Sequence, residues 1–295
     1  TNAFTQAWGQ PSSERKTLAL HGYLDNTGTF DVLGPAMAKA SGFEFVVMDF
    51  PGHGKSDAVG KESWYSMLDY PEYVIEAARS LGWDKFSLVG HSMGGAVASL
   101  VAASFPELVE RCVFIDILGP WATNPGSSPK HLRRSIESRR VLLTKEPKLY
   151  ASFDEAVRQR LKSVTMWGDN QTMSWSGAAR LVAGGSETCQ DGGQVKFTND
   201  VRRALLLRAH SPGFLSEEVV LTYLNAIECP SLLIRGERGM VADTSSFLAR
   251  KATFGDLGGG TLRDLVLPGS HHLHLDEDTA PLVADHIAAF LQGRE

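Results

Sequence analysis

The stretch FSLVGHSMGG, Phe86–Gly95, decides the fold predicted for this chain. It contains the pattern Gly-x-Ser-x-Gly with Ser92 at its centre. Phe86–Val89 is apolar and β-prone, as the end of a buried strand should be, and Ala96–Phe105 is small, apolar and free of Gly and Pro, as in a packed helix. Strand, sharp turn and helix in this order predict that Ser92 stands above a helix N-terminus, where the dipole favours developing negative charge. The stretch therefore predicts a nucleophilic serine.

Length and composition are typical of an enzyme-sized domain. The 295 residues, 43% of them hydrophobic, can bury a large core, either as one α/β domain or as a domain with an inserted lid. No stretch approaches the roughly 20 apolar residues of a membrane span. The first residues, TNAFTQAWGQPSSERK, contain no apolar signal core, although a leader could have been removed. We expect a soluble protein, intracellular rather than secreted.

Charge and cysteine content argue against general nucleic-acid binding and against a cysteine metal site. The net charge of −5 argues against general nucleic-acid binding. Cys112, Cys189 and Cys229 are odd in number and widely spaced, without the spacing of metal ligands. We interpret them as reduced and structural.

The chain alternates strands with helices, which predicts a doubly wound, mostly parallel sheet. The predicted strands are Thr17–Leu20, Phe45–Met48, Phe86–Val89, Arg111–Ile117, Pro230–Arg235 and Leu262–Leu267. The predicted helices are Tyr70–Leu81, Ala96–Phe105 and the terminal Ala280–Leu291. The fold class expected is therefore α/β.

Residues 119–226 differ in composition from the rest. They carry a charge of +5 against −10 elsewhere, and they are predicted to be helical and strand-poor. We expect an inserted helical cap here, on a core formed by residues 1–118 and 227–295. Trp121, Trp167 and Trp175 are predicted to line the substrate pocket, although aromatic residues are more often part of the core. A basic cap over an acidic body could also favour an anionic substrate.

Ser92 needs a general base, and His271 is the candidate. A base must reach the serine hydroxyl, and an acid must hold its tautomer; in this fold the order along the chain is serine, acid, histidine. His271 follows the last predicted strand and precedes a helix. Its neighbours His272 and His274 would suggest a metal site only with further suitably spaced ligands, and none is visible. We therefore expect no metal site here.

The acid has three candidates. After the strand Pro230–Arg235, where an acid is commonly expected, Gly239 occupies the usual position, with Glu237 and Asp243 nearby. Asp116 ends an apolar strand 24 residues after Ser92, and a lone buried carboxylate there is costly unless it is paired. We favour Asp116 over Asp243 and Glu237.

The oxyanion hole should combine two main-chain donors. One is the N–H of Met93, which follows the nucleophile, and the other is the N–H of Tyr23 in the loop after the first predicted strand. His21, His53 and His91 are expected to pack loops rather than to act in catalysis.

Six stretches of the chain form a recognisable set. They are LHGYLDN (Leu20–Asn26), DFPGHG (Asp49–Gly54), GHSMGG (Gly90–Gly95), FIDILGP (Phe114–Pro120), FTNDVR (Phe197–Arg202) and SHHLHL (Ser270–Leu275). Together they resemble the α/β-hydrolase superfamily and, more narrowly, serine hydrolase-like proteins of the kraken type. The resemblance implies a mostly parallel sheet, an inserted cap and no cofactor. Haloalkane dehalogenases and epoxide hydrolases look similar around Asp116 but use a carboxylate nucleophile, so Ser92 points away from both.

The residues and the resemblance together predict a serine hydrolase. Its expected reaction is cleavage of an ester, thioester or related acyl bond of a small, largely apolar substrate through an acyl-enzyme on Ser92. Two alternatives remain open: a serine-dependent carbon–carbon bond hydrolase, and a non-enzymatic ligand receptor built on the same fold.

Overall fold

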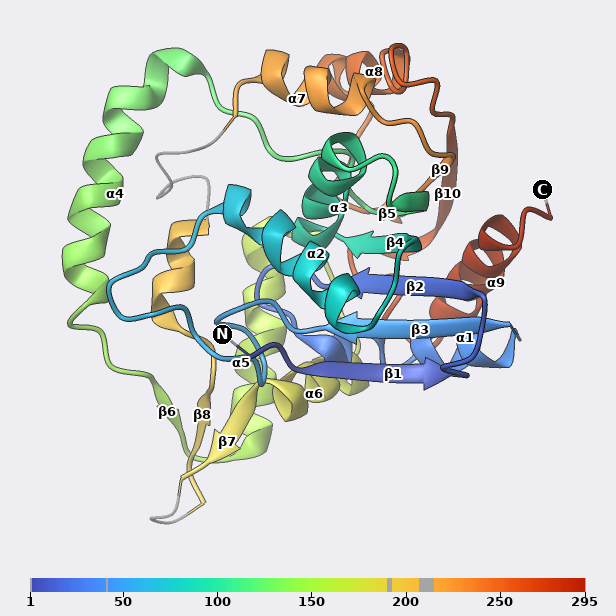
Figure 1. Cartoon of the computed structure of the whole chain (residues 1–295). Coiled ribbons are helices and arrows are strands. Elements are labelled where there is room, and N and C mark those ends of the chain that lie inside the picture. The colour runs from blue at the N-terminus through green and yellow to red at the C-terminus, as the bar shows by residue number, and fades with distance from the viewer. Residues whose placement is uncertain (1, 41, 190–192, 207–214, 295) are drawn as a thin grey trace.

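A computed structural model describes residues 2–40, 42–189, 193–206 and 215–294. Its centre is a seven-stranded sheet of order β1-β3-β2-β4-β5-β9-β10 (Figure 1). β1 pairs antiparallel with β3, and the other pairs are parallel. The strands are β1 (Thr5–Gly9), β2 (Arg15–Leu20), β3 (Phe43–Met48), β4 (Phe86–His91), β5 (Val109–Ile115), β9 (Ser231–Arg238) and β10 (Leu262–Ser270).

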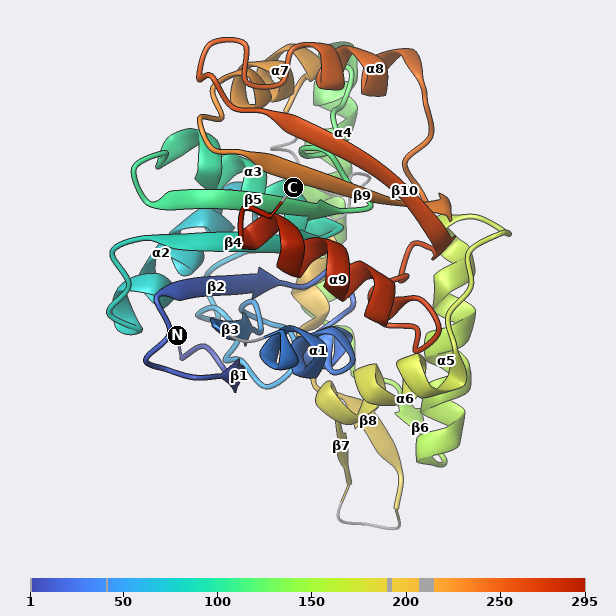
Figure 2. The same cartoon turned by 90° about the vertical axis from the view of Figure 1, so that its right-hand side faces the viewer.

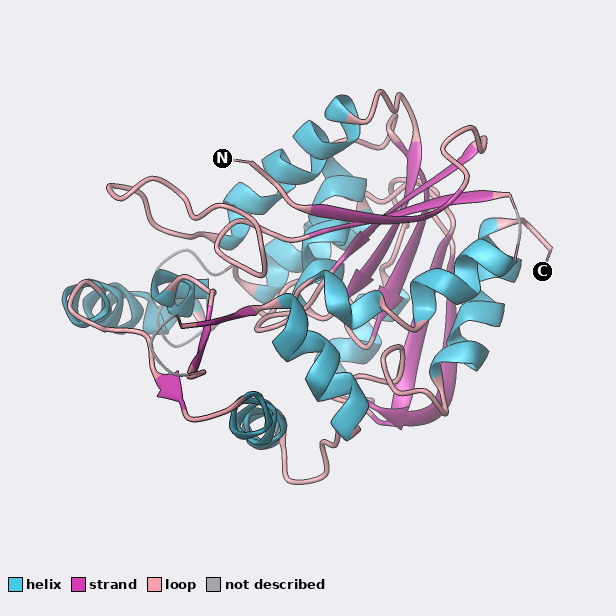
Figure 3. Cartoon of the chain, turned by 90° about the horizontal axis from the view of Figure 1, so that it is seen from below, coloured by secondary structure: helices cyan, strands magenta, loops and turns pink. Residues whose placement is uncertain are grey.

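Helices cover both faces of this sheet. α1 and α9 lie on one face, in front of the strands in Figure 2, and α2, α3, α7 and α8 cover the other. Seen from below, the strands run between these two helical layers (Figure 3). The helices are α1 (Leu33–Lys39), α2 (Tyr70–Ser80), α3 (Met93–Ser104), α7 (Glu217–Asn225), α8 (Ser245–Ala252) and α9 (Ala280–Leu291).

The alternation of side chains along β2 and β4 builds a separate core on each face. Leu18 and Leu20 of β2 belong to the cluster under α2 and α3, whereas Ala19 between them faces the cluster under α1 and α9. In β4, Leu88 and Val89 divide in the same way. The predicted α/β class with a mostly parallel sheet is confirmed.

The segment between β5 and α7 lies outside the sheet and has its own small core. Tyr150, Val157 and Leu181 belong to this cluster, which Leu275 joins from the loop after β10. The elements of the segment are η3 (Pro125–Ser127), α4 (Ser128–Leu142), β6 (Leu149–Tyr150), α5 (Phe153–Val164), η4 (Thr165–Trp167), α6 (Trp175–Gly184), β7 (Ser186–Thr188), β8 (Val195–Phe197) and η5 (Val201–Leu206). β6, β8 and β7 form a small antiparallel sheet that the sequence did not indicate.

Two differences from the predicted bounds bear on the site. α7, which falls inside the predicted cap, packs on α3 through Val220 and Leu224 in the core cluster. β5 ends at Ile115 rather than Ile117, so Asp116 is the first residue after the strand. Nothing in the described ranges is a helix long and apolar enough to cross a membrane.

Candidate active site

Ser92 occupies a strained turn between β4 and α3. Its φ of 51° and ψ of −119° lie in a region that residues other than glycine rarely adopt. Glycines allow the elements to meet: a Cβ on Gly90 would lie 2.5 Å from Gly95 Cα, and one on Gly94 would lie 2.1 Å from the oxygen of Leu20. The N–H of Ser92 donates to the oxygen of Ile115 at 3.1 Å. The serine is thus presented at the N-terminus of α3 by a tightly packed backbone.

Asp116 and His271 contact each other directly. Asp116 Oδ2 lies 2.6 Å from His271 Nδ1, and the same oxygen accepts from the N–H of Met240 at 2.7 Å. Asp116 Oδ1 accepts from the N–H of Gly236 at 3.3 Å. Burial opposes ionisation of Asp116, but the hydrogen bonds from His271, Met240 and Gly236 outweigh it and lower the pKa of this carboxyl. The ionised carboxylate can therefore fix the histidine tautomer that carries its proton on Nδ1.

Gly239 leaves the space that the Asp116 carboxylate fills. A Cβ on Gly239 would lie 2.1 Å from Asp116 Oδ1. Of the other predicted acids, Glu237 is exposed and Asp243 accepts from Arg235 Nη1 at 2.9 Å. The structure therefore brings Asp116, and neither Glu237 nor Asp243, to His271.

Two side chains hold the main chain of His271 from opposite sides. Its N–H donates to Gln171 Oε1 at 3.1 Å, and its carbonyl oxygen accepts from His91 Nε2 at 3.0 Å. Gln171 also donates to the oxygen of Arg238 at 2.7 Å, which ties the segment between β5 and α7 to the end of β9. His91, expected to pack a loop, thus also orients the main chain of the candidate base. Gln171 lies 100 residues before His271, and no pattern in the sequence singles it out.

A cluster of buried charged and polar groups lies behind the candidate base. Asp25 Oδ1 contacts Arg160 Nη2 at 2.6 Å, while Asp25 Oδ2 lies 3.3 Å from His91 Nδ1 and 3.4 Å from His272 Nε2. Burial opposes ionisation of Asp25, but its contacts with His272, His91 and Arg160 keep its pKa well below the usual range. Burial lowers the pKa of His272 to about 3, despite the nearby carboxylate. Arg160 therefore supplies the positive charge that balances Asp25.

The same cluster contains three side chains of metal-ligating type. Asp25, His91 and His272 each offer one ligand atom, all within 4.8 Å of one another. Arg160 already binds the carboxylate with its guanidinium, which would repel a divalent cation at this point. The donor set fits a buried ion pair better than a metal centre.

The loop after β2 is shaped by its own side chains. His21 Nε2 accepts from the N–H of Phe50 at 3.0 Å, which leaves His21 Nδ1 to donate to the oxygen of Gly22 at 2.8 Å. His53 packs beside His21 with ring centroids 5.1 Å apart. Tyr23 follows Gly22 in this loop. Met93 is the first residue of α3, and the first N–H groups of a helix have no partner within the helix. Their roles as oxyanion donors remain predictions.

The three tryptophans predicted to line the pocket lie in different places. Trp121 lines a cavity of about 350 Å³ together with Ile117 and Met240. Trp175 begins α6 and is 45% exposed, with Arg158 over its ring. Trp167 ends η4, and its side chain lies outside the described residues.

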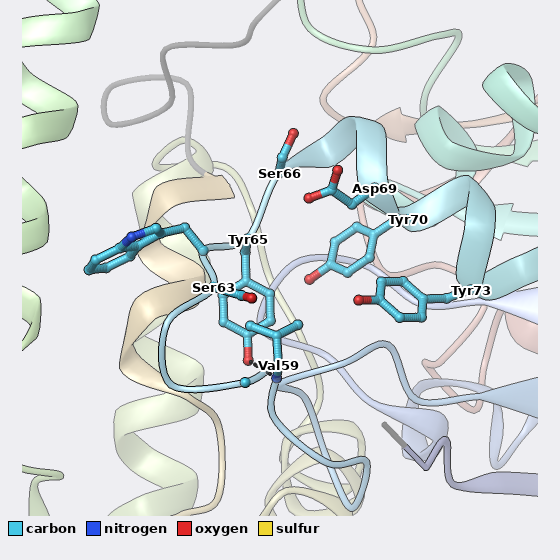
Figure 4. A pocket seen from close by; sticks show the side chains of 9 residues that line it. Val59, Ser63, Tyr65, Ser66, Asp69, Tyr70 and Tyr73 are labelled. Atoms are coloured by element: carbon cyan, nitrogen blue, oxygen red, sulfur yellow. Dashed lines mark hydrogen bonds between the residues drawn. The ribbon is translucent and has the colours of Figure 1, made fainter.

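A second cavity of about 370 Å³ lies between α2 and the loop that precedes it (Figure 4). Tyr65, Tyr70 and Tyr73 point their rings into it. The described residues that line it do not include Ser92 or His271, so this cavity is separate from the candidate catalytic groups.

Comparison with known proteins agrees with the fold described above. A family model described as alpha/beta hydrolase fold matches residues 18–278. The chain belongs to this family. The protein is 33% identical to a serine hydrolase-like protein of Dictyostelium discoideum over 93% of this chain and 75% of the relative. It is 30% identical to a serine hydrolase-like protein of Danio rerio over 97% of this chain and 84% of the relative.

Solved structures agree with this assignment. A crystal structure of a hypothetical protein from Pseudomonas aeruginosa PAO1 superposes on this α/β-hydrolase with a TM-score of 0.86. The two are 33% identical, and the match covers 98% of this chain and 95% of the other. The predicted similarity to serine hydrolase-like proteins of the α/β-hydrolase superfamily is confirmed.

Proposed function

We propose that this α/β-hydrolase cleaves an ester, thioester or related acyl bond of a small, largely apolar molecule through an acyl-enzyme on Ser92. In this proposal the nucleophile, base and acid are Ser92, His271 and Asp116. The observation that carries this proposal is the 2.6 Å contact between Asp116 Oδ2 and His271 Nδ1. Ser92, in the strained turn between β4 and α3, is the nucleophile that this pair would serve.

The proposed reaction begins with attack of Ser92 Oγ on the acyl carbonyl. His271 takes the serine proton on Nε2, and Asp116 stabilises the imidazolium that forms. The main-chain N–H groups of Met93 and Tyr23 bind the oxyanion, which is more strongly hydrogen-bonded than the ground-state carbonyl. His271 then protonates the leaving group and activates the water that releases the acid.

The buried surroundings of the base support this role. Gln171 binds the main-chain N–H of His271, and His91 binds its carbonyl oxygen. The position of the imidazole beside Asp116 is therefore fixed by main-chain contacts as well as by its own hydrogen bond to Asp116. A base held in this way loses little orientational freedom when it reacts.

Pre-steady-state hydrolysis of p-nitrophenyl butyrate tests the proposal. We expect a burst of p-nitrophenol close to one per active site, followed by slower turnover, and neither phase in Ser92→Ala. Turnover that is unchanged in Ser92→Ala would contradict the proposed nucleophile. Binding of the ester by the wild type without release of p-nitrophenol would instead favour a ligand receptor on the same fold.

A further inference from the structure

Arg203 carries a buried positive charge that no carboxylate of the described residues contacts directly. It lies in η5, and its Nη1 donates to the main-chain oxygen of Asp200 at 3.3 Å. Its Nε is shielded from solvent and has no hydrogen-bond partner within the described ranges. Burial lowers the pKa of the Arg203 guanidinium. Since a buried charge is normally in direct contact with a counter-charge, Arg203 lacks the ion pair that usually accompanies such burial.

Other arginines of similar burial have carboxylate partners. The pairs are Arg160 with Asp25 at 2.6 Å, Arg202 with Asp200 at 2.6 Å, Arg235 with Asp264 at 2.8 Å and Arg250 with Glu217 at 2.6 Å. Their arginine side chains are between 6% and 11% exposed. Arg203 makes no such contact within the described residues. Arg111 and Arg139, which are also partly buried, share this feature, and their guanidinium groups lie over the rings of Phe290 and Trp64.

The carboxylate nearest in sequence is already engaged. Asp200 accepts from Arg202 and from the hydroxyl of Tyr65 at 3.0 Å, and its hydrogen bond raises the pKa of Arg202. The residues that follow η5, 207–214, contain neither Asp nor Glu in their sequence. These neighbours therefore form no direct ion pair with Arg203, although the Asp200 carboxylate acts on its charge from a distance.

The Arg203 guanidinium lies beside the proposed oxyanion loop. Its Cζ is 5.8 Å from the centre of the Tyr23 ring, and Tyr23 is the residue whose main-chain N–H is proposed to bind the oxyanion. Burial raises the pKa of the Tyr23 hydroxyl, so this ring is neutral near pH 7 and offers a cation–π contact without balancing the charge. An anion bound at Arg203 would therefore lie next to the Tyr23 side chain, whose main chain is part of the proposed oxyanion loop.

The charge of the whole segment acts in the same direction. Residues 119–226 carry +5, whereas the rest of the chain carries −10. An anionic ligand is attracted to residues 119–226 and repelled by the rest of the chain, which favours its approach from the side of η5.

We propose that Arg203 binds a carboxylate on the acyl part of the substrate, so that the substrate class is a monoester or monothioester of a short dicarboxylic acid. This inference rests on the proposed acyl-hydrolase function. A guanidinium binds a carboxylate through two parallel hydrogen bonds. A single unbalanced arginine matches the one negative charge of a carboxylate, whereas a phosphate monoester carries more.

Two esters with the same leaving group test the inference. p-Nitrophenyl hydrogen glutarate carries a free carboxylate, and p-nitrophenyl methyl glutarate has the same chain with that charge removed. We expect the wild type to prefer the free acid in kcat/KM by roughly 10- to 100-fold, the range of a charge-assisted hydrogen bond. Arg203→Met should abolish this preference while leaving the methyl ester nearly unaffected, and Arg203→Lys should retain part of it. Arg133→Met, which removes an exposed arginine of α4, is the matched control and should behave like the wild type.

The outcomes separate this inference from the proposed hydrolase function. Turnover of both esters at equal kcat/KM, or a preference that survives Arg203→Met, would overturn the carboxylate site and leave the hydrolase intact. If neither glutarate ester is cleaved although p-nitrophenyl butyrate is, the carboxylate site is overturned and the hydrolase function stands. If none of the three esters is cleaved, the hydrolase function fails, and calorimetric binding of free glutarate to the wild type and to Arg203→Met decides the carboxylate site. Binding that Arg203→Met weakens supports the site, and absent or equal binding overturns it.

The melting temperature provides a second readout. Because Arg203→Met removes an unbalanced buried charge, we expect Tm in the absence of ligand to stay the same or rise. A lower Tm together with equal loss of activity on both esters would show that Arg203 is a structural residue and overturn the inference.

Discussion

Asp116 Oδ2 lies 2.6 Å from His271 Nδ1, although 155 residues separate the two in the chain. The contact forms because Asp116 follows β5 and His271 follows β10, and both strands flank β9 in the sheet. Gly239, just after β9, has no side chain, and a Cβ there would lie 2.1 Å from Asp116 Oδ1. An acid at the end of β5 thus occupies space that a side chain at the end of β9 would otherwise fill.

Asp116→Asn should lower kcat on the order of 10³- to 10⁴-fold while changing KM little. The amide offers no negative charge to the imidazolium and can stabilise the wrong histidine tautomer. Steady-state kinetics with p-nitrophenyl butyrate measure the effect. Asp243→Asn is the matched control, because Asp243 pairs with Arg235, and it should be mild. A larger loss of kcat in Asp243→Asn than in Asp116→Asn would contradict the assignment.

Gly239→Ala should inactivate the protein by displacing the Asp116 carboxylate. The φ of Gly239 lies outside the left-handed region, so alanine adds a steric conflict with Asp116 rather than strain of its own. We expect kcat to fall while the protein still folds, as judged by circular dichroism. At Gly60 the nearest atom to an added Cβ is 3.9 Å away, so Gly60→Ala serves as the control. Full activity in Gly239→Ala would show that the position of Asp116 is not needed.

Gln171→Leu should lower kcat roughly tenfold with little change in KM. The substitution removes the hydrogen bond to the N–H of His271 and the one to the oxygen of Arg238, at similar side-chain volume. Kinetics and Tm are measured together, with Gln10→Leu, the same substitution at an exposed position, as the control. If Gln171→Leu changes Tm alone and kcat remains that of the wild type, Gln171 stabilises the fold and does not position the base.

Stability should fall with decreasing pH below about 6.5, partly because of His272. Burial lowers the folded-state pKa of His272 from 6.5 to about 3, so between these values the unfolded state binds the additional proton. Above pH 6.5 His272 is neutral in both states, so its titration does not change the free energy of unfolding. Between pH 6.5 and about 3 this titration lowers the free energy of unfolding by about 1.4 kcal/mol for each unit of decreasing pH. Urea unfolding at pH 7.5, 6.0 and 5.0 measures this slope.

His272→Gln should make the pH dependence shallower, and His131→Gln in α4 serves as the control. The pKa values of His53 and His274 are also lowered by burial, so a slope remains in His272→Gln. An identical slope in His272→Gln and the wild type would mean that His272 does not titrate in this range.

Much of the fold was predictable because local patterns specify it. The hydrophobic stretches gave the six parallel strands, and Ala280–Leu291 was predicted with the bounds that α9 has. β1 was missed because it is short, with exposed residues at alternate positions. β6, β7 and β8 have two or three residues each, too few for a period to be visible.

The candidate site was predictable in part, for a physical reason. Ser92 and His271 are marked by the turns around them, and Asp116 by the cost of a lone carboxylate on an apolar strand. Gln171 and Arg160 act through contacts with residues 100 and 135 positions away, which no local pattern encodes. Nothing in the sequence around Arg203 indicates that it is buried. Its burial beside Tyr23 is visible only in the structure.

The central claim, that Ser92 is a covalent nucleophile, is tested most directly by mass spectrometry of the protein after treatment with a fluorophosphonate. The account predicts one phosphonyl group per chain, located on Ser92 by peptide mapping, and no adduct on Ser92→Ala. It also predicts slower labelling of Asp116→Asn, since the base that activates the serine would be misoriented. An adduct on another residue, or labelling of Ser92→Ala equal to that of the wild type, would contradict the claim.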